Sequence, residues 1–174
     1  MKLVIVTILL FFIPGDPQDY PVPPKTSKQL FYIQRNHNAN TIMYDAHFLS
    51  DGNLDPNKPI DAYWLRYDED SARKELSWID KKYAYGISTK KIENRPNQYD
   101  VELVADEERS FTLKKIAPHR AVLYTRINNI PSALDHLWIQ ADNSGIWPEV
   151  KYVELFGTDT TTNQPIYEKL IVND

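Results

Sequence analysis

Carboxylates are the most numerous groups in this sequence that could do chemistry. The chain holds 24 aspartates and glutamates, and hydrolysis of a glycosidic bond needs two carboxyl groups roughly 5–10 Å apart. Asp61 opens the aromatic segment 60–67, and Glu154 stands inside the apolar run 152–156. A carboxylate in such a segment is costly to bury unless it is paired. Asp61 and Glu154 are therefore the candidate catalytic residues, and pairing of each with a buried arginine is the structural alternative.

Arginine is the second chemical group that stands out. Four arginines lie in strand-like segments beside aromatic or aliphatic residues: Arg35, Arg66, Arg120 and Arg126. A guanidinium group stacks on aromatic rings and binds carboxylate or phosphate groups through two hydrogen bonds. Arg66 stands near Trp64 and Tyr63, so with Arg35 these residues are candidates for binding a sugar or an anionic ligand. The alternative, in which the arginines extend along the outer face of a sheet, stays open.

A calcium loop is the closest match among metal motifs. Asp51, Asn53 and Asp55 occupy its first, third and fifth positions. Pro56 replaces the glycine of the turn, and Ala62 replaces the glutamate that would bind through both oxygens. The segment is therefore interpreted as a turn rich in Asn and Asp.

Other catalytic and cofactor motifs are missing. The four histidines (His37, His47, His119 and His136) have no metal-binding spacing, although a site built from distant strands stays open. The absence of cysteine excludes disulfides, thiolate catalysis and cysteine-based zinc sites. No nucleophile elbow, phosphate-binding loop or dinucleotide fingerprint occurs. We expect neither a cofactor nor a metal.

The elements that must position these residues are mostly strands. Short apolar segments alternate with turn-forming residues, which predicts strands over 29–35, 41–48, 60–67, 87–92, 99–104, 110–116, 120–127, 134–141, 150–157 and 166–172. In the third of these, side chains alternate, so one face carries Asp61, Tyr63, Leu65 and Tyr67, and the other Ile60, Ala62, Trp64 and Arg66.

One segment has helical rather than strand periodicity. Apolar residues recur at spacings of four, three and four at Ala72, Leu76, Ile79 and Tyr83. The pattern predicts one amphipathic helix over 71–83, capped at position 70 or 71, stopped by Gly86 and lying against a sheet. The fold class expected is mainly β, a single-domain antiparallel β-barrel or β-sandwich of about nine or ten strands with one amphipathic α-helix.

The first residues resemble an export signal. Lys2 precedes the apolar run 3–13, which is too short for a membrane-spanning helix of about 20 residues. We expect a signal peptide over 1–18, a Pro-rich spacer over 19–28 and one β-rich domain over 29–174. A buried N-terminal strand is the alternative. The protein would be periplasmic or extracellular, without a stable transmembrane anchor after processing.

The net charge of the chain argues against two classes of partner. The net charge is −4 and no basic face is evident, which argues against nucleic acid as a partner. An acidic chain is also poorly suited to anionic membrane surfaces.

Five sequence blocks resemble a known family. They are residues 29–36 (QLFYIQRN), 40–44 (NTIMY), 59–67 (PIDAYWLRY), 82–86 (KYAYG) and 151–157 (KYVELFG). Together they are similar to an uncharacterised bacterial family, domain of unknown function 4833, over most of residues 29–172. The resemblance implies an exported protein of the kind common in Bacteroidetes-like bacteria. It implies no activity, cofactor or catalytic residue.

These observations favour a non-catalytic, exported domain that binds a small ligand or an envelope protein, at a barrel mouth or a sheet face covered by the predicted helix. One alternative is a hydrolase that cleaves envelope glycans with Asp61 and Glu154. Another is a structural or assembly protein that uses its sheet edges for pairing.

Overall fold

A computed structural model describes residues 20–104, 106–144 and 148–172. These residues form a mainly β fold with a single α-helix and one 3-10 turn, η1 (Tyr67–Glu69). The elements in chain order are β1 (Gln29–Arg35), β2 (Asn38–Ala46), β3 (Ile60–Arg66), β4 (Ala72–Glu75), α1 (Trp78–Tyr83), β5 (Ile87–Lys91), β6 (Gln98–Leu103), β7 (Asp106–Ala117), β8 (Arg120–Ile127), β9 (Ile130–Asp142), β10 (Glu149–Asp159) and β11 (Pro165–Ile171).

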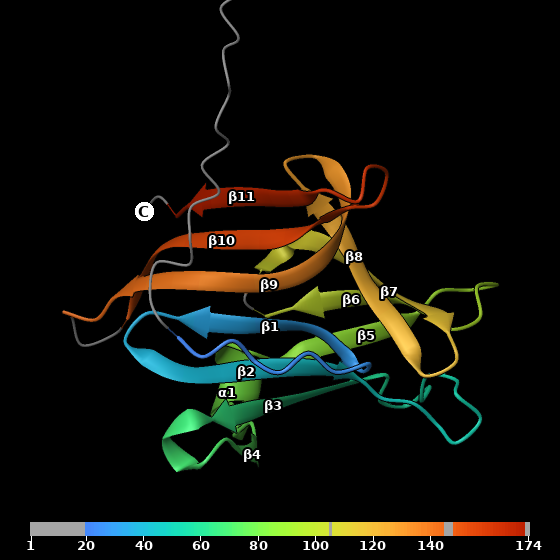
Figure 1. Cartoon of the computed structure of the whole chain (residues 1–174), viewed down its shortest axis with the longest axis horizontal. Helices are drawn as coiled ribbons and strands as arrows, with labels where there is room; N and C mark the ends of the chain where they lie inside the picture. Colours follow the sequence, from blue (N-terminus) through green and yellow to red (C-terminus); the bar gives the residue numbers. More distant parts are fainter. Residues whose placement is uncertain (1–19, 105, 145–147, 173–174) are drawn as a thin grey trace, which may run out of the picture.

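The sheet divides at the long strand β9. Residues 130–133 of β9 pair with β8, and residues 136–139 pair with β1. β10 pairs with residues 132–142 of β9. Because a strand has only two hydrogen-bonding edges, β8 and β1 share one edge and β10 takes the other. Two arms therefore leave β9: β1-β2-β3-β4, and β8-β7-β6-β5. In Figure 1 the first arm lies below β9, while β8 turns away toward β7.

The core lies between the two arms. Strand by strand, every second side chain points inward, and the inward residues of both arms form one apolar cluster that includes Phe31, Ile33, Ile42, Tyr44, Val101, Leu103, Phe111, Leu113 and Leu123. The rings of Phe31 and Tyr44 stack with centroids 4.2 Å apart. Since each such side chain contributes roughly 1.5–3 kcal/mol when fully buried, this shared cluster holds the curled sheet as a half-barrel.

The predicted fold class, mainly β with a single helix, is confirmed, and the structure shows an architecture between the two versions considered. The eleven strands form one curled sheet, a half-barrel, rather than a closed barrel or two separate sheets. All but one of the strand pairings are antiparallel; β1 and β9 run parallel. Asn36 extends that parallel pair, because its side-chain amide bonds both the N–H (2.8 Å) and the carbonyl oxygen (2.7 Å) of Ala141.

The helix predicted over 71–83 is wrong in its first half. Asp70 and Ser71 have positive φ angles of 54° and 59°, which an α-helix does not allow. They instead turn the chain so that β4 pairs with β3. Pairing along the free edge of β3 thus outweighs the helical spacing of the apolar residues.

The α-helix that does form, α1, begins at Trp78 rather than near position 71, and none of its residues is buried. Ser77 caps it: the hydroxyl oxygen accepts from the backbone N–H of Asp80 (3.1 Å), and the Asp80 carboxylate accepts from the N–H of Ser77 (3.0 Å). This capping box was the signal that sequence analysis missed. Ile79 and Tyr83, expected to face a sheet, are 54% and 64% exposed.

The N-terminal segment 20–28 packs on the domain. It forms neither helix nor strand, as its prolines predict. Tyr20 stacks on Trp138 at 5.4 Å, and the carbonyl oxygen of Pro21 accepts a 2.9 Å hydrogen bond from Gln34. Residues expected to act only as a spacer therefore cover the outer face of β1 and β9. The expected signal peptide, 1–18, lies outside the described residues. Among those described, no helix has the length and apolar character needed to cross a membrane.

Candidate functional site

β3 places the candidate residues on both faces of the first arm. Trp64 is 8% exposed and belongs to the core cluster. Asp61 and Tyr63 lie on the opposite, outer face, as the alternation of side chains predicts. Tyr63 and Trp64 are therefore neighbours in sequence but not members of one site.

Three of the four predicted ligand-binding residues converge at one end of this arm. β1 and β3 each pair antiparallel with β2, so they run in the same direction, and their last residues, Arg35 and Arg66, lie at the same end. The start of β2, the 3-10 turn η1 and helix α1 supply the remaining walls. A pocket of about 460 Å³ results, here called the Arg35 pocket, lined by Arg35, Asn38, Asn40, Trp64, Arg66, Asp68 and Asp80.

Arg35 is held by aromatic rings. Its guanidinium carbon lies 5.1 Å from the ring centroid of Trp64 and 5.5 Å from that of Tyr85, within range of a cation–π interaction. One N–H donates to the hydroxyl of Tyr85. Within the described part of the chain, Arg35 forms no ion pair with a carboxylate. The guanidinium is thus held by aromatic side chains and has no described carboxylate in direct contact.

The other charges of the pocket are already engaged. Arg66 contacts both carboxylate oxygens of Asp68, at 3.1 and 3.2 Å, and a carboxylate oxygen of Glu69 at 3.2 Å. Asp80 accepts a 3.3 Å hydrogen bond from the indole N–H of Trp64. Among the described lining residues, Arg35 and Asp80 therefore have no opposite charge in direct contact, although Arg35 is near enough to help lower the pKa of Asp80.

The two aspartates of the pocket are poor proton donors. The hydrogen bond from Arg66 lowers the pKa of Asp68. Burial alone would raise the pKa of Asp80, but hydrogen bonds from Ser77 and Trp64 outweigh it and lower that pKa. Both carboxyl groups are ionised at neutral pH, so they can accept hydrogen bonds but cannot serve as a general acid.

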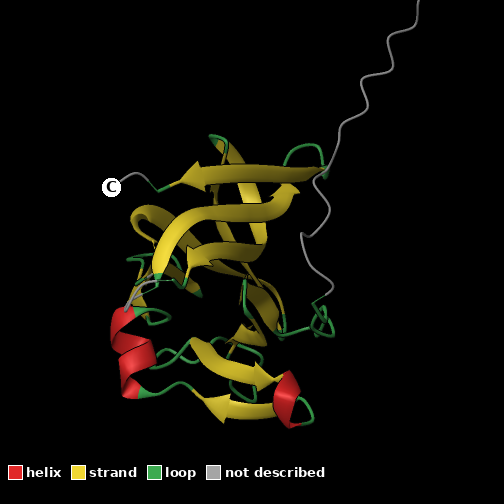
Figure 2. Cartoon of the chain, turned by 90° about the vertical axis from the view of Figure 1, so that its left-hand side faces the viewer, coloured by secondary structure: helices red, strands yellow, loops and turns green. Residues whose placement is uncertain are grey.

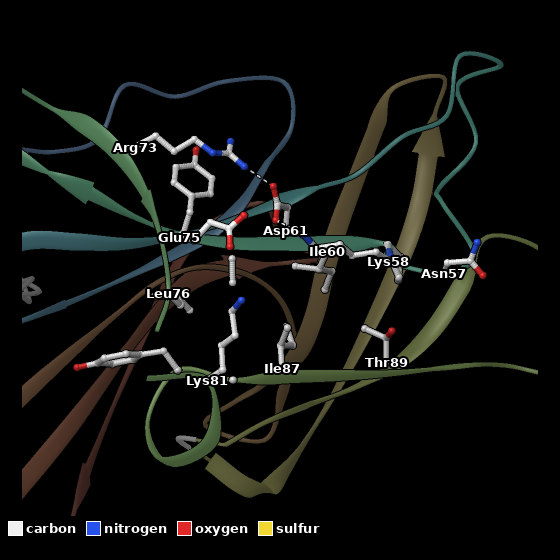
Figure 3. Close-up of a pocket in the computed structure, with 15 residues that line it drawn as sticks. Asn57, Lys58, Ile60, Asp61, Arg73, Glu75, Leu76, Lys81, Ile87 and Thr89 are labelled. Atoms are coloured by element: carbon white, nitrogen blue, oxygen red, sulfur yellow. Dashed lines mark hydrogen bonds and ion pairs between the residues drawn. The ribbon is translucent and has the colours of Figure 1, made fainter. Parts of the chain in front are cut away.

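A second cavity separates the free edges of the two arms. β4 pairs only with residues 63–66 of β3, and β5 is the last strand of the other arm. Between them lies a space of about 410 Å³, here called the seam cavity, whose lining includes Asp61, Arg73, Glu75, Lys81, Ile87 and Thr89. Figure 3 shows Asp61 and Arg73 on one side of it and Ile87 and Thr89 on the other.

Asp61 is fully paired at the edge of the seam cavity. Its two oxygens bond the ammonium of Lys58, at 2.6 Å, and the guanidinium of Arg73. Burial would raise the pKa of Asp61, but these two cations lower it overall. On the same strand, Tyr63 donates a 2.9 Å hydrogen bond to Asp45 of the neighbouring strand β2. The partners of Asp61 are thus Lys58 and Arg73, not the strand arginines Arg35 and Arg66 considered from the sequence.

Glu154 lies far from Asp61. It is 5% exposed on β10, where it accepts a 2.6 Å hydrogen bond from the hydroxyl of Tyr167 and lies 3.6 Å from the ammonium of Lys169. Three strands separate β3 from β10, which is about 19 Å along the sheet at about 4.8 Å per strand. The structure does not bring the two candidate catalytic carboxylates together.

Comparison with protein families matches residues 31–169 to the model of a domain of unknown function, DUF4833. The chain belongs to the DUF4833 family. The matched region contains every candidate residue named above, from Arg35 to Glu154. Searches of curated proteins and of solved structures found no match. Roles for residues of this DUF4833 domain must therefore come from its geometry.

The calcium-like loop of the DUF4833 domain is an Asx turn. The carboxylate of Asp51 accepts hydrogen bonds from both the backbone and the side-chain N–H groups of Asn53, each at 2.8 Å. Asp55 accepts from the N–H of Asn57 at 2.8 Å. Across the described ranges, no group of three or more acidic or histidine side chains is placed to hold a metal ion.

Sequence reasoning missed four residues that line the Arg35 pocket and one that lies beside it: Asn38, Asn40, Asp68, Asp80 and Tyr85. Asp80 enters through the short helix α1, and Tyr85 follows that helix and is 6% exposed. The capping box predicts the position of Asp80 along the helix, but no local pattern predicts that either side chain reaches Arg35.

Proposed function

We propose that this domain is a non-catalytic binding module of the bacterial envelope, and that its Arg35 pocket takes an acidic saccharide. The observation that carries the proposal is the state of Arg35. Aromatic rings and the Tyr85 hydroxyl fix its guanidinium, yet no described carboxylate pairs with it. A carboxylate on the ligand would complete the pair through two parallel hydrogen bonds.

The rest of the lining favours a ligand rich in hydroxyl groups. Besides Trp64, every lining residue is polar or charged. Asn38 and Asn40 carry amide N–H donors, and Asp68 and Asp80 carry ionised acceptors. The formal charges of the lining sum to zero, two arginines against two aspartates. Recognition of an anion would therefore depend on direct contact with Arg35 rather than on a broad positive field.

The same features favour binding over hydrolysis. Asp61 and Glu154 lie on strands that three others separate, and each already has a cationic neighbour. Within the Arg35 pocket, both carboxyl groups have lowered pKa values. A glycosidase needs one carboxyl group that stays protonated to act as the general acid, and neither aspartate meets that requirement.

Calorimetric titration of the full chain tests this function. The ligands are an oligosaccharide of glucuronic acid and its neutral glucose counterpart. Arg35→Gln should weaken binding of the acidic ligand at least tenfold, because a hydrogen bond to a charged group contributes about 1.5–3 kcal/mol. The matched control, Arg120→Gln, alters an exposed arginine on β8 of the other arm and should bind as the wild type does. Equal affinity for the two ligands, or an unchanged Arg35→Gln variant, would refute the proposal.

A further inference from the structure

Helix α1 carries an exposed apolar surface. Trp78, Ile79 and Tyr83 are 67%, 54% and 64% exposed, respectively, although large apolar side chains in soluble domains are normally much more buried. Figure 2 shows α1, the longer helix in that view, at the margin of the molecule. Three such residues on a helix of six form a concentrated surface rather than scattered single residues.

The exposed arc of α1 is aromatic and basic. At about 100° per residue, Trp78, Lys82, Ile79 and Tyr83 fall in that order on one side of the helix; these four residues are called the α1 patch. The rings of Trp78 and Tyr83 lie 6.4 Å apart, and the ammonium of Lys82 lies 4.9 Å from the Tyr83 ring centroid.

The helix separates its charges by face. Its one acidic residue, Asp80, turns away from the patch to cap the helix at Ser77 and to accept from Trp64. The next residue, Lys81, is also exposed, but it lines the seam cavity together with Glu75. The positive charge of the patch is therefore that of Lys82, on a chain whose net charge is −4.

We propose that the α1 patch docks the domain on the surface of a lipid bilayer that contains anionic lipids. Tryptophan, tyrosine and lysine together are typical of helices that lie in the membrane interface, with apolar rings at the headgroup boundary and ammonium groups at the anionic surface. Lysine can extend its apolar stem along the rings and keep its charge at the headgroups. Because α1 has only six residues, docking would be weak and reversible.

The charge distribution explains why the net charge of the sequence predicted no binding to anionic membranes. The net charge of −4 argued against an anionic membrane, but surface potentials act only within about 10 Å at moderate salt. At that range the local charge of Lys82 decides the interaction. This proposal does not depend on the Arg35 pocket, although Asp80 belongs to that pocket and α1 would hold it close to the docked surface.

Vesicle co-sedimentation of the full chain tests docking. One set of vesicles is phosphatidylcholine alone, and the other also contains phosphatidylglycerol. The double variant Trp78→Ser/Tyr83→Ser should lose most of the binding to the mixed vesicles. Lys82→Gln should weaken that binding about fivefold. Ile171→Ser, at a residue 60% exposed on β11, is the matched control and should bind as the wild type does.

Comparing variants removes the contribution of the apolar run 3–13, because every variant carries it. Circular dichroism spectra and melting curves check that each variant is folded. Wild-type-like binding by the Trp78→Ser/Tyr83→Ser variant, or binding indifferent to phosphatidylglycerol, would overturn the proposal. The proposal would also be overturned if that variant bound vesicles as the wild type does and if, in sedimentation equilibrium, the wild type were a dimer and the variant a monomer. The patch would then join two copies of the chain.

Discussion

Two arginine–aromatic contacts lie on opposite faces of the same arm. On the outer face, the guanidinium carbon of Arg73 lies 3.7 Å from the ring centroid of Tyr63. On the inner face, that of Arg35 lies 5.1 Å from the ring centroid of Trp64. Arg73 also pairs with Asp61, whereas Arg35 has no described carboxylate partner. The contact is of the same kind, but only Arg73 has a described carboxylate in direct contact.

The difference shows that the two faces of one strand hold their arginines differently. Because side chains of β3 alternate between faces, Tyr63 and Trp64 recruit separate arginines from β4 and β1. A ligand at Arg73 would have to displace Asp61. A ligand at Arg35 would supply the missing anion, with aromatic rings already holding the guanidinium in place. Pre-organisation of this kind lowers the entropic cost of binding.

The largest expected effect comes from the aromatic partners. Trp64→Ala should lower the free energy of unfolding by about 3–5 kcal/mol, as expected for a large buried side chain, because Trp64 contacts Arg35, Tyr85 and Asp80. Tyr63→Ala, at a half-buried outer position, should cost about 1 kcal/mol. Urea unfolding followed by circular dichroism measures both. Equal losses would mean that the two faces are not energetically distinct.

Much of the fold could be predicted from alternation alone. The bounds of β1 and β8 agree with those predicted, 29–35 and 120–127. The parallel pairing of β1 with β9 could not be predicted, since it depends on contacts such as Tyr32 with His136, which are distant in sequence. The prediction of a helix over 71–83 is wrong because the apolar spacing of residues 72–76 suits a helix as well as a strand. Only pairing with the free edge of β3 decides between the two.

A smaller difference in the free energy of unfolding is expected between variants of Arg35 and Arg73. Arg35→Gln should lower the free energy of unfolding by about 1–2 kcal/mol through loss of the cation–π contacts and the bond to Tyr85. Arg73→Gln should cost under about 1 kcal/mol, because its side chain is 54% exposed and exposed ion pairs contribute little. Urea titrations of both variants under identical conditions give the comparison. A larger loss for Arg73→Gln would reverse the proposed ranking of the two contacts.

The candidate site could be predicted only in part. Arg35, Trp64 and Arg66 were named from sequence, and the parallel course of β1 and β3 brings them together. Tyr63 was grouped with Trp64 because the two are adjacent, yet the alternation of the same strand separates them. Tyr85 reaches Arg35 only through the tertiary position of the segment after α1, which no local periodicity encodes.

The smallest effect is a pH dependence confined to the outer face, where Asp45 of β2 stands opposite Asp61 of β3. Burial raises the pKa of Asp45 despite the hydrogen bond from Tyr63, so its stabilising contribution is present at low pH and is lost as the pH rises through its native pKa. Burial also acts on Asp61, but Lys58 and Arg73 lower its pKa. Its contribution is therefore present above the unfolded pKa of about 3.9 and is lost as the pH falls.

Two variants separate these opposite slopes. Asp61→Asn should be less stable than the wild type near neutral pH, by under about 1 kcal/mol after solvent screening, and the deficit should shrink toward acid pH. Asp45→Asn keeps an oxygen that can accept from Tyr63 and should gain stability relative to the wild type as the pH rises. Urea midpoints measured from acid to neutral pH show both trends. Parallel pH profiles for the two variants would mean that Arg73 and Lys58 do not make the pKa of Asp61 differ in direction from that of Asp45. The ion pairs of Asp61 would then not stabilise the outer face.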